Sequence, residues 1–240
     1  MLAGFLGGFV MLIIEKGCDK LPKALNGIKP VLIYPLGGLA VVAIMMCAVN
    51  PIMGIINEAV ANFLTNMGGT NKVLLGCTLG AMMSIDMGGP FNKAAYVFGV
   101  AAISSGNFDI MAAVMIGGMV PPIAIALATT FFKNKFTEEE RKSGPVNYIM
   151  GLSFITEGAI PYAAADPMRV IPACMIGAAA AGGLSMAFGC TLRAPHGGIF
   201  VFPVVGNPIM YVVALAVGSV IGMLLLGLFK KKVTESVSYT

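Results

Sequence analysis

The sequence predicts an all-α polytopic membrane protein with about seven transmembrane segments, the first of them short. Of the 240 residues, 58% are strongly hydrophobic and another 31 are glycine, while only 11% are charged. A soluble domain has about 25% charged residues, so this chain carries too few to cover its apolar surface. Disorder is excluded as well, because it requires low hydrophobicity and high charge. The first apolar run stops at Ile14, which is short for a hydrocarbon core of about 30 Å.

Most of the Lys and Arg residues fall in three clusters, and these clusters set the predicted topology. The clusters are Lys16, Lys20, Lys23 and Lys29; Lys133, Lys135, Arg141 and Lys142; and Lys230, Lys231 and Lys232. The positive-inside rule places all three in the cytoplasm. The net charge of +4 therefore does not form a basic stripe across one face, and nucleic-acid binding is not expected.

The chain between the first two clusters is predicted to cross the membrane four times. The apolar segments expected to cross are 31–49, 71–85, 94–106 and 110–132. Segment 52–67 carries Glu58 and several asparagines at near-helical spacing, which predicts an amphipathic helix lying at the outer surface. Four crossings return the chain to the cytoplasm, as the second cluster requires.

The remaining chain offers three apolar segments, at 147–165, 168–190 and 199–229, and three crossings would leave the last cluster outside. One segment must therefore not cross. Residues 147–166 contain Glu157 near their centre and are interrupted at Gly158 and Pro161. Non-helical backbone at membrane depth is tolerated only where it is buried in protein or lines a wet cavity. We therefore predict a re-entrant hairpin over 147–166, with Glu157 near its tip.

Three stretches place polar or ionisable side chains beside helix-breaking residues. They are SIDMGGPFNKAAY with Asp86, Asn92 and Lys93; FITEGAIPYAAADPMR with Glu157, Asp166 and Arg169; and LRAPHGG with Arg193 and His196. An ionisable group in a bilayer core costs at least about 2.5–3.5 kcal/mol, which favours a functional role. Interrupted helices near the midplane are typical of a transporter's substrate site. Carboxylates, an amide and an imidazole offer the donors and acceptors that sugar hydroxyls need.

Structural interpretations stay open for several of these residues. Asp86 could simply pair with Lys93, and Asp166 with Arg169. His196 could be a plain polar residue at the outer edge. Cys18 follows Lys16 in the first cytoplasmic loop and is either an ordinary thiol or a more reactive one.

No metal, cofactor or catalytic residue is expected from the sequence. The five cysteines are odd in number and scattered, which argues against a disulfide framework or a structural zinc site. The single histidine and the dispersed carboxylates have no metal-ligand spacing. The chain also lacks a G-x-x-x-x-G-K-[ST] phosphate-binding loop.

Three stretches, taken in order, resemble enzyme IIC of the fructose family. They are DMGGPFNKAAY (86–96), FITEGAIPYAAADP (154–167) and APHGG (194–198). Enzyme IIC is the membrane permease of the bacterial phosphoenolpyruvate-dependent sugar phosphotransferase system. The loop LPKALNGIKPVLIYPL is also similar to that family, and the resemblance covers most of the chain.

The resemblance implies a homodimeric permease in the bacterial inner membrane, surrounded by lipid, that moves a fructose-like sugar by an elevator-like shift. A partner IIB domain carrying a phosphocysteine phosphorylates the sugar. Residues 1–240 hold no IIA or IIB domain, so the enzymatic activity belongs to the complex. Glu157 matches the glutamate that contacts sugar hydroxyls. The remaining residues predicted to bind substrate, from matching motif positions, are Asp86, Asn92, Lys93 and His196.

Compared with a complete permease, residues 1–240 are expected to form a IIC membrane domain that lacks its N-terminal helices. Two alternatives stay open at this point. One is an ion-coupled secondary sugar transporter in which Asp86, Glu157 and Asp166 carry protons. The other is a truncated, non-transporting assembly subunit. The sugar itself is also left open, because one methyl group in a pocket changes discrimination by only about 1–3 kcal/mol.

Overall fold

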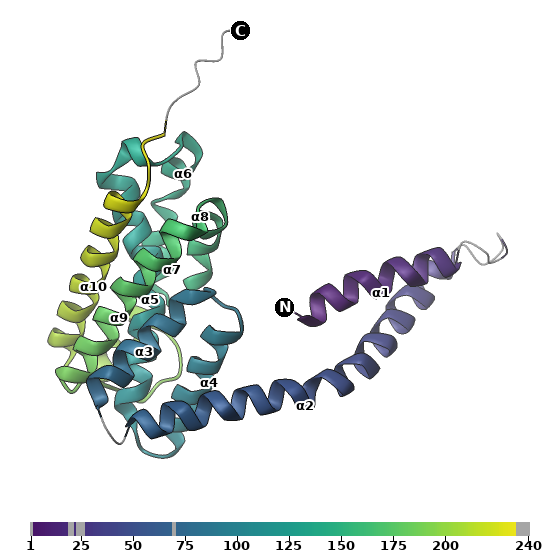
Figure 1. The fold of residues 1–240 in the computed structure, drawn as a ribbon, viewed down its shortest axis with the longest axis horizontal. Coiled ribbons are helices and arrows are strands. Elements are labelled where there is room, and N and C mark those ends of the chain that lie inside the picture. The colour runs from purple at the N-terminus through teal and green to yellow at the C-terminus, as the bar shows by residue number, and fades with distance from the viewer. Residues whose placement is uncertain (1, 19–21, 23–26, 69–70, 234–240) are drawn as a thin grey trace, which may run out of the picture. The chain divides into compact units, whose positions relative to one another are not determined.

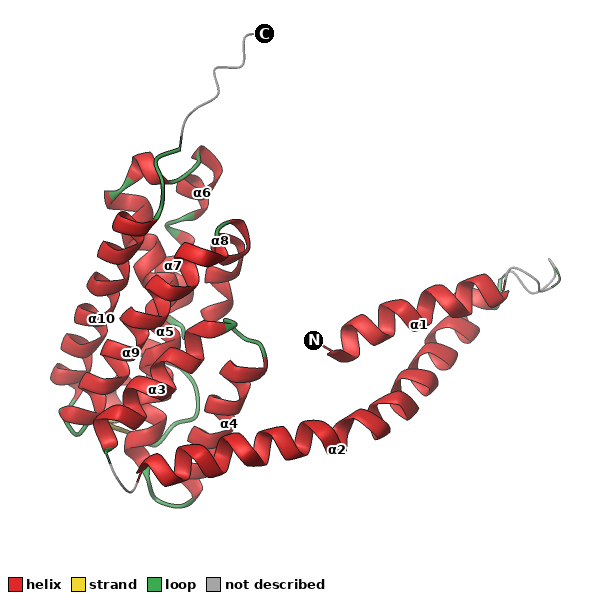
Figure 2. Cartoon of the chain, in the orientation of Figure 1, coloured by secondary structure: helices red, strands yellow, loops and turns green. Residues whose placement is uncertain are grey.

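The computed structural model describes residues 2–18, 22, 27–68 and 71–233. Helices dominate these residues (Figure 2), which confirms the all-α prediction. Four helical stretches in the described part of the chain are long and apolar enough to cross a membrane: Lys29–Ile52, Phe108–Phe131, Pro167–Ala187 and Pro208–Phe229. The multi-pass membrane fold is thus confirmed, while the number of about seven crossings stays a prediction. The chain divides into two compact units, Met1–Asn62 and Phe63–Thr240.

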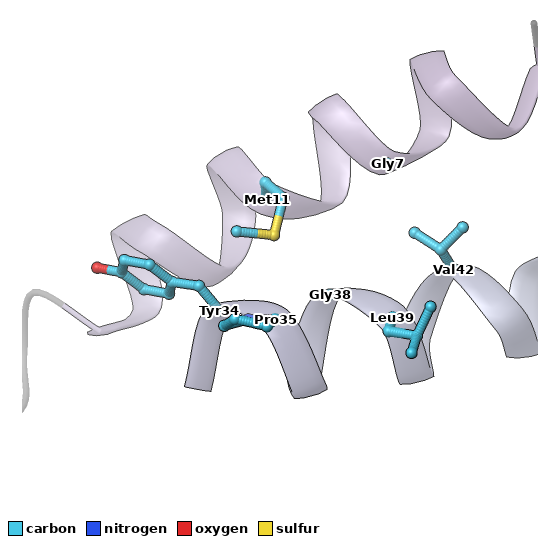
Figure 3. Close-up of a pocket in the computed structure, with 7 residues that line it drawn as sticks. All are labelled: Gly7, Met11, Tyr34, Pro35, Gly38, Leu39 and Val42. Carbon is cyan, nitrogen blue, oxygen red and sulfur yellow. The ribbon is translucent and has the colours of Figure 1, made fainter. Parts of the chain in front are cut away.

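Within the first unit, α1 (Leu2–Cys18) packs on the beginning of α2 (Tyr34–Gly68). A π-helical turn, Lys29–Ile33, leads into α2. Met11 lies over Gly38 in Figure 3, and a Cβ at Gly38 would be only 2.6 Å from the Met11 sulfur. Such small residues let apolar helices approach closely. An apolar cavity of about 380 Å³ lies beside this contact.

Helix α2 is one helix of 35 residues, where we expected a crossing over 31–49 and a separate amphipathic helix over 52–67. Pro51 lies inside α2 without ending it. The apolar stretch suited to crossing ends at Ile52, and the exposed Glu58 follows within the same helix. The position of this polar half at the outer surface stays a prediction.

In the second unit, α3 (Lys72–Ile85) and α4 (Pro90–Ser104) form a hairpin, which we call the first hairpin. The two helices have 14 and 15 residues, or about 21–23 Å, short of a hydrocarbon core of about 30 Å. Lys72 Nζ lies 2.9 Å from Asp109 Oδ2, next to the end of α4. The segments expected to cross over 71–85 and 94–106 form two arms that begin and end at the same end of the unit (Figure 1). Their crossing of the membrane stays a prediction.

The core of the second unit is built from α5 (Phe108–Phe131), α9 (Pro167–Ala187) and α10 (Pro208–Phe229), with α3 against α9. Residues 111–122 of α5 are all buried. Small residues permit the close packing, since a Cβ at Gly117 of α5 would lie 2.6 Å from the Cα of Gly80 in α3. The apolar surfaces of these helices thus face one another and form one scaffold.

The last apolar segment, expected to cross the membrane over 199–229, becomes an α-helix only at Pro208. The preceding residues form a two-stranded antiparallel sheet, β1 (Thr191–Leu192) with β2 (Val205–Gly206), and a 3₁₀ helix, Gly198–Val204. Pro203 removes a backbone donor there, and Asn207 adopts a left-handed conformation with φ of 61°. This connection between α9 and α10 carries the APHGG motif.

The second and third cationic clusters lie together at one end of the second unit. That end contains the 3₁₀ turn Lys133–Lys135, α6 (Glu138–Ser143) and the end of α10. Lys230 Nζ is 3.3 Å from Glu140 Oε1, and α6 lies at the opposite end of the unit from the start of α3 (Figure 1). This agrees with a shared side for the two clusters, whereas their cytoplasmic location stays a prediction. In the first cluster, Lys20 and Lys23 lie outside the described residues.

Residues 146–165 form α7 (Val146–Leu152), a 3₁₀ turn (Thr156–Ala159) and α8 (Ile160–Ala165) rather than one crossing helix. The amide of Asn147 donates to the Gly144 carbonyl at 3.0 Å. At the other end, the Tyr162 hydroxyl donates to the Glu140 carbonyl at 2.9 Å. The segment, which we call the second hairpin, thus begins and ends beside α6. This geometry supports the predicted hairpin; its insertion into the membrane stays a prediction.

Candidate functional site

The tips of the two hairpins meet, although the hairpins start from opposite ends of the unit. Lys93 of α4 places Nζ 3.6 Å from Oε1 of Glu157 in the second hairpin. Gly88 lies at the tip of the first hairpin with φ of +119°, and a Cβ there would be 2.8 Å from the same oxygen. Gly88 is therefore required both by its backbone conformation and by the close approach of Glu157.

The Lys93–Glu157 pair is loose and open. The distance of 3.6 Å between Lys93 Nζ and Glu157 Oε1 exceeds the range of about 2.7–3.2 Å for a good N–H···O hydrogen bond. The side chains of Lys93 and Glu157 are 60% and 47% exposed. Within the described part of the chain, neither of these two side chains has another ion pair or hydrogen bond. Both groups are thus placed where a polar ligand can reach them.

Helix α5 fixes the tip of the second hairpin next to Glu157. The buried Thr156 hydroxyl donates to the Gly118 carbonyl at 2.8 Å. A Cβ at Gly118 would itself lie 2.8 Å from that hydroxyl oxygen. The hairpin backbone approaches α5 this closely because Gly118 has no side chain, so the carboxylate of Glu157 projects from an anchored turn.

A third loop, containing His196, packs on the same tip. The His196 ring lies 4.9 Å from the ring of Phe154, and Phe154 in turn lies 6.4 Å from Tyr96. A Cβ at Gly198, whose φ is +57°, would overlap the carbonyl oxygen of Leu152. The side chain of His196 is exposed. Three motifs that are far apart in the sequence therefore gather around the tip of the second hairpin.

Both hairpin tips contain a buried residue other than glycine in a left-handed conformation. Met87 has a φ of 44° in the first tip, and Phe154 has a φ of 62° in the second. A bulky residue with positive φ is an outlier that costs of the order of 1–3 kcal/mol, and such strain concentrates at functional sites. The backbone therefore singles out the same two tips as the charged residues.

Asp86 and Asn92 shape the first tip. The carboxylate of Asp86 accepts hydrogen bonds from the amides of Phe91 (2.7 Å) and Asn92 (3.0 Å), so it caps the start of α4. The side-chain amide of Asn92 is buried and donates to the Met83 carbonyl at 2.8 Å. Asp86 does not pair with Lys93, because the Lys93 side chain faces Glu157 instead.

The two arginines near the motifs do not pair with Glu157. Arg169 Nη1 lies 3.1 Å from both carboxylate oxygens of Asp166, which is the structural pair considered from the sequence. The Arg193 guanidinium lies over the Phe108 ring, 4.9 Å from its centroid. Among the described residues, no group of three or more His, Cys, Asp or Glu side chains could hold a metal ion.

Of the predicted site residues, the structure brings Glu157 and Lys93 into contact and places His196 against the same tip through Phe154. The contribution of Phe154 was missed, although it stands three residues before Glu157 in the quoted motif. Gly118 was also missed, because one glycine in an apolar helix carries no signal of what packs against it.

Comparisons with known proteins agree with the resemblance noted in the motifs. The family model for phosphotransferase system EIIC matches residues 1–177. The fructose permease IIC component of Bacillus amyloliquefaciens is 49% identical, over 97% of this chain and 79% of that protein. The fructose-specific EIIABC component of Bacillus subtilis is 51% identical, over 97% of this chain and 38% of that protein. The fructose-specific EIIB'BC component of Escherichia coli is 45% identical, over 91% of this chain and 40% of that protein.

The chain thus spans well under half of the two fused relatives. No solved structure gives a significant match.

Proposed function

Because the chain belongs to the EIIC family of the phosphotransferase system, we propose that it is the membrane-embedded subunit that binds and translocates fructose or a fructose-like sugar. The relatives named above are a fructose permease component and fructose-specific components. The observation that carries the proposal is the meeting of two interrupted segments at an open carboxylate, Glu157. Such segments form the substrate sites of many transporters.

In this proposal the Glu157 carboxylate accepts hydrogen bonds from sugar hydroxyls, and the exposed imidazole of His196 contacts the same sugar. Carboxylate acceptors form the stronger, charge-assisted hydrogen bonds. Asp86 and Asn92, also predicted to bind sugar, support the site instead, because their polar atoms already bind backbone groups of the first hairpin. Lys93 supplies the charge that balances Glu157 in the sugar-free site.

The phosphoryl group comes, in this proposal, from a IIB partner carrying a phosphocysteine. Several relatives are fused proteins whose names contain a B component next to the C component. The partner docks at the end of the second unit that carries α6 and the end of α10, where two cationic clusters lie together. The chain acts as a homodimer in the bacterial inner membrane.

Uptake of radiolabelled fructose into vesicles containing the chain tests this function. We expect labelled fructose phosphate inside vesicles that are supplied with phosphoenolpyruvate, the soluble phosphocarriers and a IIB domain, and none when IIB alone is left out. Accumulation of unmodified fructose driven by a proton gradient would contradict the proposal and favour an ion-coupled transporter. Neither that alternative nor a non-transporting subunit gains support from the comparisons.

A further inference from the structure

The cations near the hairpins differ in whether their partners are fixed. Arg169 binds both oxygens of Asp166, and Arg193 lies over the Phe108 ring. Lys72 binds Asp109 at 2.9 Å at the base of the first hairpin. Among the described residues, Lys93 is the one cation that faces Glu157. It is therefore the one positive charge already at the meeting of the two tips.

The partner of Lys93 can be exchanged. The Lys93–Glu157 separation is 3.6 Å and both side chains are about half exposed, and an exposed ion pair of this kind contributes little stability. Asp86, the other carboxylate of the first hairpin, is occupied by two α4 amides. Once sugar hydroxyls bind Glu157, the ammonium group of Lys93 is released next to that sugar.

The charge of the site then changes between sugar binding and phosphoryl transfer. A sugar is neutral, so its binding to Glu157 needs no additional cation. A phosphoryl group brings about two negative charges at neutral pH, and these would lie beside the negative carboxylate of Glu157. Phosphoryl transfer depends on cations that stabilise the charge of the equatorial oxygens. An interaction made only at that stage accelerates transfer without strengthening sugar binding.

We propose that Lys93 is a catalytic residue, which leaves Glu157 and binds the phosphoryl group while that group is transferred to the sugar. The inference rests on the proposed function. In this step a sugar hydroxyl oxygen forms a new P–O bond while the S–P bond of the partner's phosphocysteine breaks. The sulfur leaves as a thiolate with the electron pair of the S–P bond, and the hydroxyl proton passes to the carboxylate of Glu157. No atom of Lys93 enters the product. When the sugar phosphate has left and Glu157 has released its proton to water, Lys93 pairs with the Glu157 carboxylate again.

The test separates sugar binding from transfer, using the full chain in vesicles and the variants Lys93→Met and Lys93→Arg. Binding of labelled fructose is measured at equilibrium without the partner, and transfer is measured in a single turnover with phosphorylated IIB. Lys93→Met is expected to change the fructose dissociation constant by no more than about fivefold, yet to slow transfer by about 100-fold or more. Lys93→Arg keeps the charge and should recover part of the rate.

Lys72→Met is the matched control, because Lys72 lies in the same hairpin and is also exposed and paired with a carboxylate, but at the base. It should leave both measurements unchanged. If Lys93→Met transfers the phosphoryl group at the unaltered rate, the inference about Lys93 is wrong, while the proposed function stands. Equal losses of binding and transfer in Lys93→Met would also overturn it, since Lys93 would then serve sugar binding. Failure of the unaltered chain to bind fructose would overturn the proposed function as well.

Discussion

Two Lys–Glu pairs in the second unit show how differently the same residue types are used. At the end that carries α6, Lys230 and Glu140 are 3.3 Å apart, with side chains 7% and 17% exposed. Lys230 also lies over the Phe136 ring, and Glu140 completes a capping box with Thr137. At the hairpin tips, Lys93 Nζ and Glu157 Oε1 are 3.6 Å apart and both side chains are about half exposed. Neither side chain has a further ion pair or hydrogen bond among the described residues.

Burial and additional contacts therefore distinguish an ion pair that stabilises the fold from one that is available to a ligand. Lys230 can leave Glu140 only by depriving a partly buried carboxylate of its cation, whereas Lys93 can leave Glu157 for water or for a substrate at little cost. The fixed pair joins α10 to α6, and α6 receives the end of the second hairpin through Tyr162. The fold therefore fixes the base of the second hairpin and leaves the Glu157 carboxylate at its tip accessible.

The largest effect is expected from breaking the fixed pair. Lys230→Met should lower the free energy of unfolding by about 2–3 kcal/mol, because it leaves the partly buried Glu140 carboxylate without its cation. Lys93→Met should cost at most about 1 kcal/mol, since its pair is exposed. Thermal unfolding of both variants in the same detergent measures the difference. Equal losses of stability would remove the distinction between the two pairs.

A smaller effect should follow from crowding the open pair. Gly88→Ala should weaken fructose binding by about tenfold, because the new methyl group meets Glu157 and displaces its carboxylate from a charge-assisted hydrogen bond. Gly106→Ala is the control, since Gly106 also has a positive φ, +80°, but has no atom near its missing Cβ. Both variants place an alanine at a positive φ, although the φ of Gly88, +119°, lies further from the left-handed region than that of Gly106. Equal fructose affinities in an equilibrium binding assay would contradict the placement of Gly88 under Glu157.

The smallest effect concerns the capping carboxylate. Asp86→Ala should lower the free energy of unfolding by about 1 kcal/mol, as loss of a helix cap does, and should leave fructose affinity nearly unchanged. Thermal unfolding and equilibrium binding of the same preparation check both statements. A large loss of affinity at normal stability would instead restore Asp86 as a sugar ligand.

The tips were largely predictable, because charge and helix breakers coincide there. Glu157 beside Gly158 and Pro161 predicted an interrupted segment, and the structure shows one. The partner of Glu157 was not predictable from local spacing, because Lys93 reaches it from another hairpin. The capping contacts of Asp86 were not predicted for a similar reason, because a carboxylate near a glycine-rich bend is equally compatible with a ligand and with a helix cap. Its binding of sugar stays a prediction.

The arrangement of the first hairpin was only partly predictable. Segments 71–85 and 94–106 are apolar, but their helices have 14 and 15 residues, fewer than the roughly 20 that a crossing usually needs, and their crossing of the membrane stays a prediction. The Lys72–Asp109 pair that brings their ends together joins distant positions, which no periodicity reveals. The charge count is the same in either case, because a hairpin and two crossings both return the chain to the side on which it started.

The central claim is that Glu157 is the open acceptor for sugar hydroxyls, and Glu157→Gln tests it most directly. The amide keeps the shape but turns one acceptor into a donor, so one hydroxyl meets a mismatched partner. Binding of labelled fructose without the IIB partner should weaken by about 10- to 150-fold, the loss of one charge-assisted hydrogen bond of about 1.5–3 kcal/mol. Glu139→Gln, at an exposed position in α6, should bind normally. Unaltered fructose affinity in a correctly inserted Glu157→Gln protein would contradict the account.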